Sequence, residues 1–392
     1  MDRTRRDFIK GGMLSLAGLS FIPGKYRSGR NDPGQSGDEK KIIYRTLGKT
    51  GIKVPIVGMG VVDNTSVLPH AFNSGMSFIL SSGSYRNGNS ERWIGGFLRN
   101  KPRDSFVVAT GFDPRPFLDS RELKFTRRPG KDVIIRFAED SLRRLRLEYI
   151  DIYNICNLAS EETVLYEPFL QGVDDLKKSG KIRFVGAGTH QYEPLVLRTS
   201  ADSGVYDTVM TAHNFRKNNR EDIKNAIAYA AGKGLGIVAM KTQAGVYWDG
   251  QRRNMINMPA ALKWALQDEN VHTSVPAFSN ISEFNEGFSV MEDLPLTPSE
   301  LRDLRITEEN QEGGMFCQQC RECMKQCPYP FDIPTVMRSY MYAYGYGNLI
   351  KARETLDLPE FENIPCKDCG ACSVKCAMNF DIRKKVLDII SV

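Results

Sequence analysis

From residue 42 onward, short apolar runs rich in β-branched residues alternate with longer amphipathic stretches. The apolar runs are Val54–Val57, Phe78–Leu80, Phe106–Ala109, Ile150–Ile155, Ile182–Val185, Thr208–Thr211, Gly236–Met240 and Val271–Val275. Stretches such as Asp132–Arg146 and Asp222–Gly232 have the apolar spacing of surface helices. Eight strands alternating with helices over roughly 250 residues predict an α/β fold, a (β/α)₈ TIM barrel. A doubly wound open sheet is the alternative, but no G-x-G-x-x-G turn follows the first strand.

Beyond residue 300 the alternation gives way to two cysteine runs, each spaced C-x2-C-x2-C-x3-C. The first run is Cys317, Cys320, Cys323 and Cys327, and the second is Cys366, Cys369, Cys372 and Cys376. This is the spacing of bacterial ferredoxins with 4Fe–4S clusters, in which the fourth cysteine of each run ligates the other cluster. We therefore expect two clusters. One would be held by Cys317, Cys320, Cys323 and Cys376, and the other by Cys366, Cys369, Cys372 and Cys327.

Zinc binding or disulfide formation would also account for so many cysteines. Structural zinc sites usually place two ligand pairs further apart in the sequence. Cysteines separated by two residues pair poorly with each other, and disulfides suit small exported domains. The trailing Pro328 also matches the ferredoxin pattern. The spacing therefore favours a small, α-helical, ferredoxin-like iron–sulfur domain over residues 301–392, behind a barrel over residues 42–300.

The N-terminus carries a different signal. Thr4-Arg5-Arg6-Asp7-Phe8-Ile9-Lys10 and the short apolar stretch after it resemble a twin-arginine export signal over residues 1–23. Residues 24–41 are polar, with Gly, Ser and Pro, and are typical of a flexible linker. We therefore expect the protein to be periplasmic or otherwise exported, and tethered to the membrane if the signal is not cleaved.

Composition narrows the class of partner. The chain has 392 residues and a net charge of +6, without the Lys/Arg block of nucleic-acid-binding proteins, so no nucleic-acid partner is expected. Eight of the nine cysteines fall in the two runs, which leaves only Cys156. A buried thiol at a strand end is more often a small core residue than a nucleophile.

Several local sequences resemble the aldo/keto reductase family. They include Tyr44–Gly60, Gly88–Glu91, Tyr149–Tyr153 and Gly236–Lys241, in the family's order and spacing over roughly residues 42–290. A branch of that family carries a C-terminal ferredoxin-like domain. The resemblance implies a TIM barrel whose site lies at the carboxyl ends of the strands.

Three of the four residues that carry the family's chemistry are replaced in this chain. The positions of the family's Asp, Lys and His hold Leu80, Gly111 and Cys156, and only the tyrosine remains, as Tyr85. In the family a lysine cation lowers the pKa of the tyrosine, which is near 10 in a free phenol. The resemblance therefore leaves Tyr85 as the one candidate catalytic residue and predicts that it is a poor acid near neutral pH.

The nicotinamide site is altered as well. The family's cationic residues for the NADP 2′-phosphate align with Ala277 and Glu283. An acidic side chain there would repel the phosphate, so tight NADPH binding is not expected, and NAD(H) or no nucleotide stay open. Glu286, matching an adenine-contacting residue, and Lys241, at the end of the seventh strand, are the candidate cofactor-binding residues.

These observations favour an exported iron–sulfur oxidoreductase or electron-transfer protein on an aldo/keto reductase barrel that lacks most of the family's tetrad. Its clusters would exchange electrons with a partner whose identity the sequence does not give, and its barrel mouth would bind a small molecule. A non-catalytic binding barrel with structural clusters and an NAD(P)H-dependent carbonyl reductase remain alternatives. His190 and His213 are expected at the barrel mouth as replacement acid/base groups, and the aromatic stretch Tyr340–Tyr346 is expected to pack around the clusters.

Overall fold

The computed structural model describes residues 42–62, 64–249, 251–309, 314–329, 331–358, 361–362 and 364–391. The expected export signal and linker lie outside these residues. Residues 42–392 form one compact unit that contains both the strand–helix repeat and the cysteine runs.

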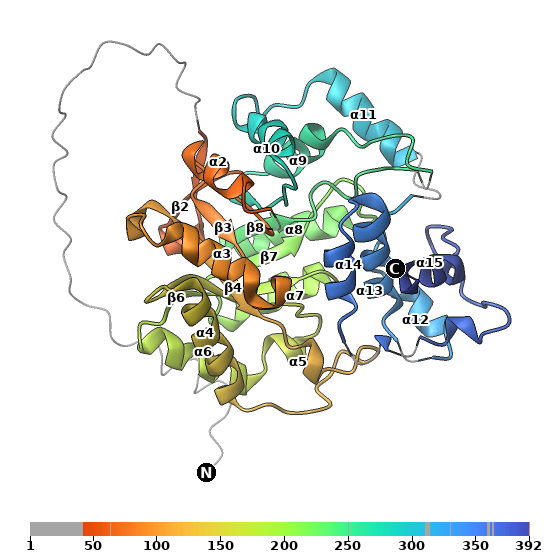
Figure 1. The fold of residues 1–392 in the computed structure, drawn as a ribbon, viewed down its shortest axis with the longest axis horizontal. Helices are drawn as coiled ribbons and strands as arrows, with labels where there is room; N and C mark the ends of the chain where they lie inside the picture. Colours follow the sequence, from red (N-terminus) through yellow and green to blue (C-terminus); the bar gives the residue numbers. More distant parts are fainter. Residues whose placement is uncertain are drawn as a thin grey trace. The chain divides into compact units, whose positions relative to one another are not determined.

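Seven parallel strands form the central sheet in simple sequence order (Figure 1). They are β3 Phe78–Leu80, β4 Val107–Phe112, β5 Ile150–Ile155, β6 Ile182–Thr189, β7 Thr208–Ala212, β8 Gly236–Met240 and β9 Thr273–Ser274. Residues 56–60 close the ring, because Val57 bridges Ser274 of β9 and Met59 bridges Ile79 of β3, both in parallel. The predicted (β/α)₈ barrel is therefore confirmed.

The first predicted strand is wrong in its position. Residues Lys53–Pro55 form β2, which pairs in an antiparallel hairpin with β1 (Tyr44–Thr46) rather than with the barrel. The hairpin turn lies against the start of β8: Gly48 has φ +51°, and an added Cβ would come within 2.4 Å of the Gly236 nitrogen. The apolar run continues from β2 into residues 56–60, which close the barrel, so periodicity alone did not separate the hairpin strand from the barrel strand.

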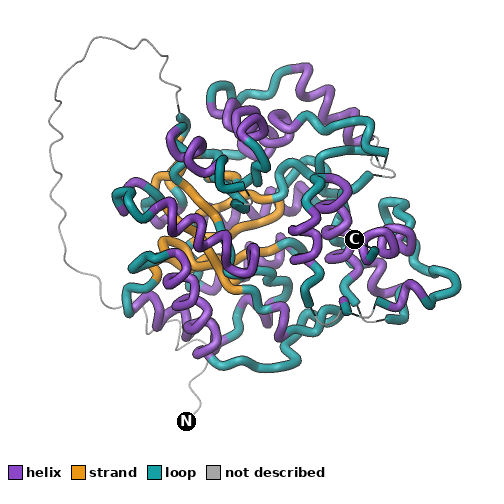
Figure 2. Tube along the Cα trace, in the orientation of Figure 1, coloured by secondary structure: helices purple, strands orange, loops and turns teal. Residues whose placement is uncertain are grey.

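Helices surround the sheet on its outer side (Figure 2). They are α2 Val67–Asn73, α3 Asn89–Leu98, α4 Lys131–Leu145, α5 Glu161–Val164, α6 Glu167–Lys178, α7 Glu193–Ser203, α8 Arg220–Gly232, α9 Met258–Leu266, α10 Ile281–Phe288 and α11 Pro298–Glu309. One apolar core lies between these helices and the sheet, and a second fills the barrel interior with residues such as Phe78, Ile152 and Val238. Inward and outward side chains alternate along a strand, so one run of strand residues supplies both cores.

Residues 314–391, here named the C-terminal segment, hold further helical elements, besides the short 3-10 helix η8 (Pro365–Lys367). These are α12 Glu322–Gln326, α13 Ile333–Tyr340, the π-helix η6 Met341–Gly345, α14 Leu349–Thr355 and α15 Ile382–Ile390. Their shared apolar core is small, and several of the cysteines pack against it. Within the described residues, no helix has the length and apolar character needed to span a bilayer.

The C-terminal segment is fixed to the barrel by buried polar contacts. Lys217, in the loop after β7, forms an ion pair with Glu193 at 2.6 Å and donates to the Gln318 carbonyl at 3.1 Å. Arg321 donates to the Ser120 carbonyl and to the side-chain oxygen of Gln191. These contacts place the segment over the loops at the carboxyl ends of the strands, where barrel sites are built.

Candidate functional site

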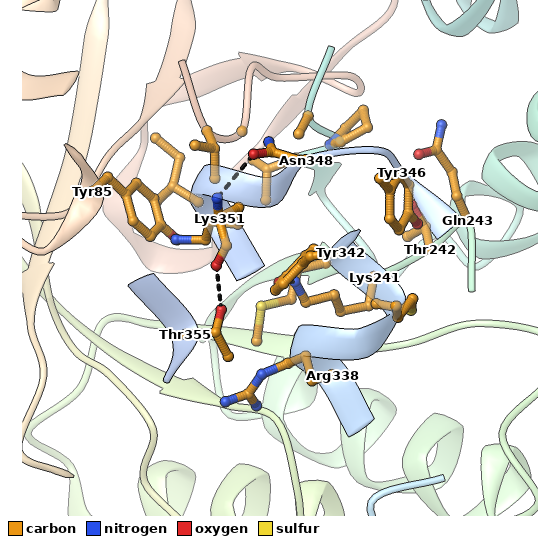
Figure 3. Close-up of a pocket in the computed structure, with 18 of the residues that line it drawn as sticks. Tyr85, Lys241, Thr242, Gln243, Arg338, Tyr342, Tyr346, Asn348, Lys351 and Thr355 are labelled. Carbon is orange, nitrogen blue, oxygen red and sulfur yellow. Dashed lines mark hydrogen bonds between the residues drawn. The ribbon is translucent and has the colours of Figure 1, made fainter. Parts of the chain in front are cut away.

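A cavity of about 420 Å³ lies between the barrel mouth and the C-terminal segment. Barrel residues that line it include Leu80, Met210 and Met240, which end three of the strands or lie near their ends. The opposite wall comes from α13, η6 and α14, through Arg338, Met341, Tyr342, Tyr346 and Lys351 (Figure 3). The volume suits a small organic molecule. The cavity is therefore a joint product of the two parts of the chain.

Tyr85 lines this cavity from the turn after β3. The ammonium of Lys351 lies 3.7 Å from the centre of the Tyr85 ring. Lys351 also pairs with Glu354 at 3.5 Å, and Glu354 accepts a hydrogen bond from the Arg86 backbone at 2.7 Å. As in the family, a lysine ammonium lies beside the tyrosine, but here it belongs to Lys351 of α14 and faces the ring of Tyr85.

The three replaced positions are apolar or crowded. Leu80 is buried and lines the cavity. At Gly111, an added Cβ would lie 2.4 Å from the Asn154 carbonyl oxygen and 3.0 Å from the Cys156 sulfur, so the backbone leaves no room for a side chain. Burial, with a smaller contribution from Asp113, raises the pKa of the Cys156 thiol to about 12, which makes it a poor nucleophile.

Two acidic residues of α10 line the cavity: Glu286, expected to contact a nucleotide, and Glu283, expected to repel its 2′-phosphate. The Glu283 carboxylate accepts hydrogen bonds from the Ser279 backbone at 2.7 Å and the Asn280 side chain at 3.0 Å, at the start of α10. An internal anion therefore occupies the end of the helix at which a phosphate would be stabilised.

Lys241 follows β8 in the left-handed conformation, with φ +58°. Its ammonium donates a hydrogen bond to the phenol oxygen of Tyr342 on η6. Burial opposes ionisation of that phenol, but the cations of Lys241, Lys351 and Arg338 outweigh it and lower the pKa of Tyr342 to about 8. The sequence alone does not reveal this contact, because Lys241 and Tyr342 are 101 positions apart and only the folded chain brings them together.

The two histidines occupy different places. His190 lines the cavity, and burial, followed by Arg338 and Lys241, holds its pKa well below the ordinary value. His213 is not among the lining residues; its ring packs 4.9 Å from Trp264, and burial lowers its pKa to about 4. The expectation that both histidines serve the barrel mouth is therefore wrong for His213, which is buried against Trp264 of α9.

The cysteines gather in two groups. Burial, with smaller contributions from the nearby thiols of Cys376 and Cys320, raises the pKa of Cys317 to about 12. Cys323 has the same neighbours. Burial likewise raises the pKa of Cys366 to about 11, with Cys327, Cys372 and Cys369 as its neighbours. Each set of neighbours takes its fourth cysteine from the other run, as the ferredoxin spacing predicts.

The chain around these thiols is shaped to enclose a group. Gln319 and Arg321, on either side of Cys320, both have left-handed backbones. The backbone amides of Gln319 and Met378 each donate to a cysteine sulfur two residues before, at 3.4 Å. Within the described residues, no three His, Cys, Asp or Glu side chains are already placed to hold a single metal ion. The fit to cubane clusters rests on the donor set, the pairing of the runs and these amides.

A second, small cavity of about 30 Å³ adjoins the first. It is lined by Cys317 and shares His190, Lys241, Arg338 and Met341 with the main cavity. This is about the space of one water molecule. One of the expected cluster ligands thus lies next to the wall that carries Tyr342.

Comparisons with known proteins agree with this architecture. The model of the aldo/keto reductase family matches residues 62–260, and that of a 4Fe-4S dicluster domain matches residues 316–381. The chain is 26% identical over 226 residues to L-galactose dehydrogenase of Arabidopsis thaliana, covering 51% of this chain and 65% of that protein. It is 26% identical over 236 residues to an aldo-keto reductase of Alternaria alternata, covering 50% and 64%.

Solved structures show the same fold. An aldo-keto reductase from Bacillus halodurans in its holo form superposes with a TM-score of 0.54 at 18% identity, covering 69% of this chain and 100% of that one. An aldo-keto reductase from Klebsiella pneumoniae in complex with NADPH gives a TM-score of 0.53 at 20% identity, covering 70% and 99%. These likenesses establish the barrel, while the substrate must be argued from the cavity.

Proposed function

Because the chain belongs to the aldo/keto reductase family and carries a 4Fe-4S dicluster domain, we propose that it is an exported iron–sulfur oxidoreductase. Its barrel lacks most of the family's tetrad. Two 4Fe–4S clusters, held by the cysteine sets described above, would supply one-electron transfer. Its parts are an export signal over residues 1–23, a linker over 24–41, the barrel over 42–300 and the cluster domain over 301–392.

One observation carries the proposal: the cavity is walled jointly by the barrel and the C-terminal segment. Cys317 lines the small cavity that shares four residues with the main one. In a protein whose clusters were only structural, nothing would require a ligand cysteine beside the ligand cavity. The shared wall therefore favours electron exchange between the clusters and a small molecule in the cavity.

The nucleotide side supports the same view. Glu283 already occupies the helix end that would take a phosphate, and Gly111 leaves no room for the family's lysine. NADPH-driven reduction of simple aldehydes should therefore be near background, since general acid catalysis alone contributes about 10²–10⁴-fold. Turnover of an ordinary aldehyde with NADPH, abolished by Tyr85→Phe, would show that the family's usual chemistry survives here.

Anaerobic purification followed by iron and sulfide analysis tests the central claim. Two complete clusters give about eight irons per chain, and a redox titration should show low-potential optical changes. Zinc in place of iron in anaerobically prepared protein would overturn the proposal. A partner protein would then have no electrons to give to or take from this chain.

Export is tested separately. The arginine pair Arg5-Arg6 is the part of the signal that a twin-arginine system reads. Changing both residues to lysine should keep the protein out of the periplasm in cell fractionation. Unchanged delivery would mean that this stretch is an ordinary charged N-terminus.

A further inference from the structure

We propose that Tyr342, held by Lys241, is the proton-transferring residue of the cavity, and that it acts on the carbonyl oxygen of a small, negatively charged carbonyl compound. The proposal rests on the oxidoreductase function proposed above, and it moves the catalytic acid from the barrel to the C-terminal segment. Tyr85 then lines the cavity without giving the proton.

Geometry is the first support. Tyr342 lines the cavity from η6, and Lys241 reaches it from the carboxyl end of β8, where barrel enzymes place their catalytic groups. The residue Lys241 adopts a left-handed backbone, a conformation that costs a non-glycine residue free energy and persists where the surroundings impose it. The hydrogen bond between the two side chains is thus built from both parts of the chain.

Electrostatics is the second support. The cations that face the phenol are Lys241, Lys351 from α14 and Arg338 from α13, and they overcome burial to bring the pKa of Tyr342 to about 8. Tyr346, at the end of the same helix, has its ring 6.3 Å from that of Tyr342. The cavity is also lined by Glu354, which pairs with Lys351, and by His190, whose pKa burial holds well below its ordinary value. A general acid works best when its pKa is near the operating pH, and a free phenol is too weak for that.

Charge balance indicates the class of substrate. Among the described residues, five cations and four carboxylates line the cavity, an excess of one positive charge. Two of the cations are engaged, since Arg115 pairs with Asp113 at 2.7 Å and Lys351 pairs with Glu354 at 3.5 Å. Arg252 lies over the Tyr247 ring, 5.2 Å from its centre. Within the described part of the chain, Lys241 and Arg338 have no carboxylate at ion-pairing distance. Arg338 donates to the neutral hydroxyl of Thr335, at 3.1 Å.

On the barrel side, the cavity has an apolar patch formed by Leu80, Met210 and Met240. A 2-oxo acid with an apolar substituent fits both walls. Its carboxylate would lie at Arg338, which has the fork of donors that carboxylates take, its carbonyl oxygen would lie at Tyr342, and its substituent would lie on the methionines.

The proton transfer joins two oxygen atoms. The O–H bond of Tyr342 breaks as an O–H bond forms on the carbonyl oxygen, and the resulting tyrosinate stays against the ammonium of Lys241. Reduction of the carbonyl to an alcohol takes two electrons, which a low-potential donor would supply and which the clusters held by the two cysteine runs would carry one at a time. The proton that carbon takes and the one that restores Tyr342 come from solvent.

The titration of the phenol tests the proposal without any turnover. In the oxidised holoprotein, the near-ultraviolet absorbance of tyrosinate should rise with a midpoint near pH 8, and Tyr342→Phe should remove that step. Lys241→Met should shift the midpoint upward by ~1–3 units, the effect of losing a nearby opposite charge. The control is Tyr344→Phe on the same helix, because the Tyr344 hydroxyl donates to the Asp388 carbonyl and faces α15.

Turnover then tests the chemical role. With reduced methyl viologen as donor and phenylglyoxylate as the 2-oxo acid, Tyr342→Phe should lower kcat by ~10²–10⁴-fold with little change in KM. Because the protonated phenol is the donor, the wild-type rate should fall as pH rises through about 8, and this limb should move in Lys241→Met. Arg338→Met should raise KM for phenylglyoxylate ~10–100-fold and leave that for neutral benzaldehyde unchanged.

The outcomes separate this inference from the proposed function. A titration near pH 8 that survives Tyr342→Phe, or no such titration, overturns the inference even when eight irons are present. Zinc in the cysteine sites overturns the proposed function, and the titration still reports on Tyr342. If phenylglyoxylate is not reduced although the titration is found, the substrate class is wrong. A kcat that falls more in Tyr85→Phe than in Tyr342→Phe returns the role to Tyr85.

Discussion

The barrel buries its apolar side chains in two continuous cores, one inside the sheet and one between the sheet and the outer helices. The C-terminal segment has one small core, and cysteines form part of its boundary. Small domains rarely bury enough apolar surface to be stable without a metal or a cross-link. We therefore expect the barrel to be stabilised by its own apolar cores, whereas the stability of the C-terminal segment should depend on the group that its cysteines bind.

The cavity takes one wall from each of these regions. Its barrel wall combines apolar strand ends, such as Leu80 and Met240, with the ammonium of Lys241. Its other wall carries Arg338, Lys351 and the phenol. The barrel therefore supplies the shape of the site and one cation, while the C-terminal segment supplies the phenol and the other two cations that face it. Three experiments test this division of roles.

Removing the iron–sulfur clusters should have the largest effect on folding. Chelation of the holoprotein should unfold the C-terminal segment and leave the barrel folded, because ligand binding supplies most of the folding free energy of such small domains. Hydrogen exchange measured by mass spectrometry should show loss of protection in α13 and α15 but not in β4–β8. Equal protection in the apoprotein would mean that the apolar core of the segment is sufficient by itself.

Removing the Lys217 contacts, which join the barrel to the C-terminal segment, should have the second-largest effect on stability. Lys217→Met leaves the Glu193 carboxylate buried without its cation, which typically costs about 3–5 kcal/mol. The two side chains are 3% and 2% exposed. A urea titration of the holoprotein would measure the change in the free energy of unfolding.

Lys178→Met is the matched control for that experiment. It removes a similar pair with Asp174 on the surface, where the side chains are 72% and 46% exposed. Exposed pairs of this kind contribute little to stability, because solvent and salt screen them. Similar losses in the two variants would show that the buried ion pair, together with the Lys217 bond to the Gln318 carbonyl that is lost with it, contributes no more than an exposed pair.

The smallest effect should come from the barrel wall. Gly111→Ala would place a methyl group against the Asn154 carbonyl, and overpacking of this kind costs about 1–3 kcal/mol. Gly96→Ala, in α3 with open space around it, should instead stabilise the protein by about 0.5–1 kcal/mol. Thermal unfolding distinguishes the two, and a neutral Gly111→Ala would show that the wall can yield to a lysine.

Much of the barrel could be predicted, because its strands are apolar runs and its helices have strong periodicity. Ile150–Ile155 and Gly236–Met240 match β5 and β8 residue for residue. The first barrel strand could not be placed, since the hairpin strand β2 and residues 56–60 form one apolar run. The pairing of the cysteine runs also followed from spacing, because ligand spacing reflects the geometry of the bound group.

The polar wall of the cavity could not be predicted. Tyr342, Arg338 and Lys351 lie on elements that follow the barrel, and only tertiary packing brings them to Lys241. The aromatic stretch contained an unused signal. Its tyrosines divide into two faces: Tyr340 and Tyr344 stack at 4.5 Å, with Tyr344 bonded to α15, while Tyr342 and Tyr346 line the cavity. The expectation that the whole stretch packs around the clusters is therefore wrong for Tyr346, while Tyr342 lines the cavity and also packs against the small core that the cysteines border.

The π-helix η6 makes the site sensitive to chain length. A π-turn accommodates one more residue than the α-turn it interrupts. Deleting one residue from Met341–Gly345 would restore the α period and rotate α14 by about 100° relative to α13. Arg338 and Lys351, which lie on either side of η6, would then no longer face the same phenol. Deleting a single residue here would thus disrupt the polar wall of the cavity, although every barrel residue and every cysteine is kept. Among homologous chains, the length of this stretch is therefore a better marker of a shared chemistry than the identity of any one residue in it.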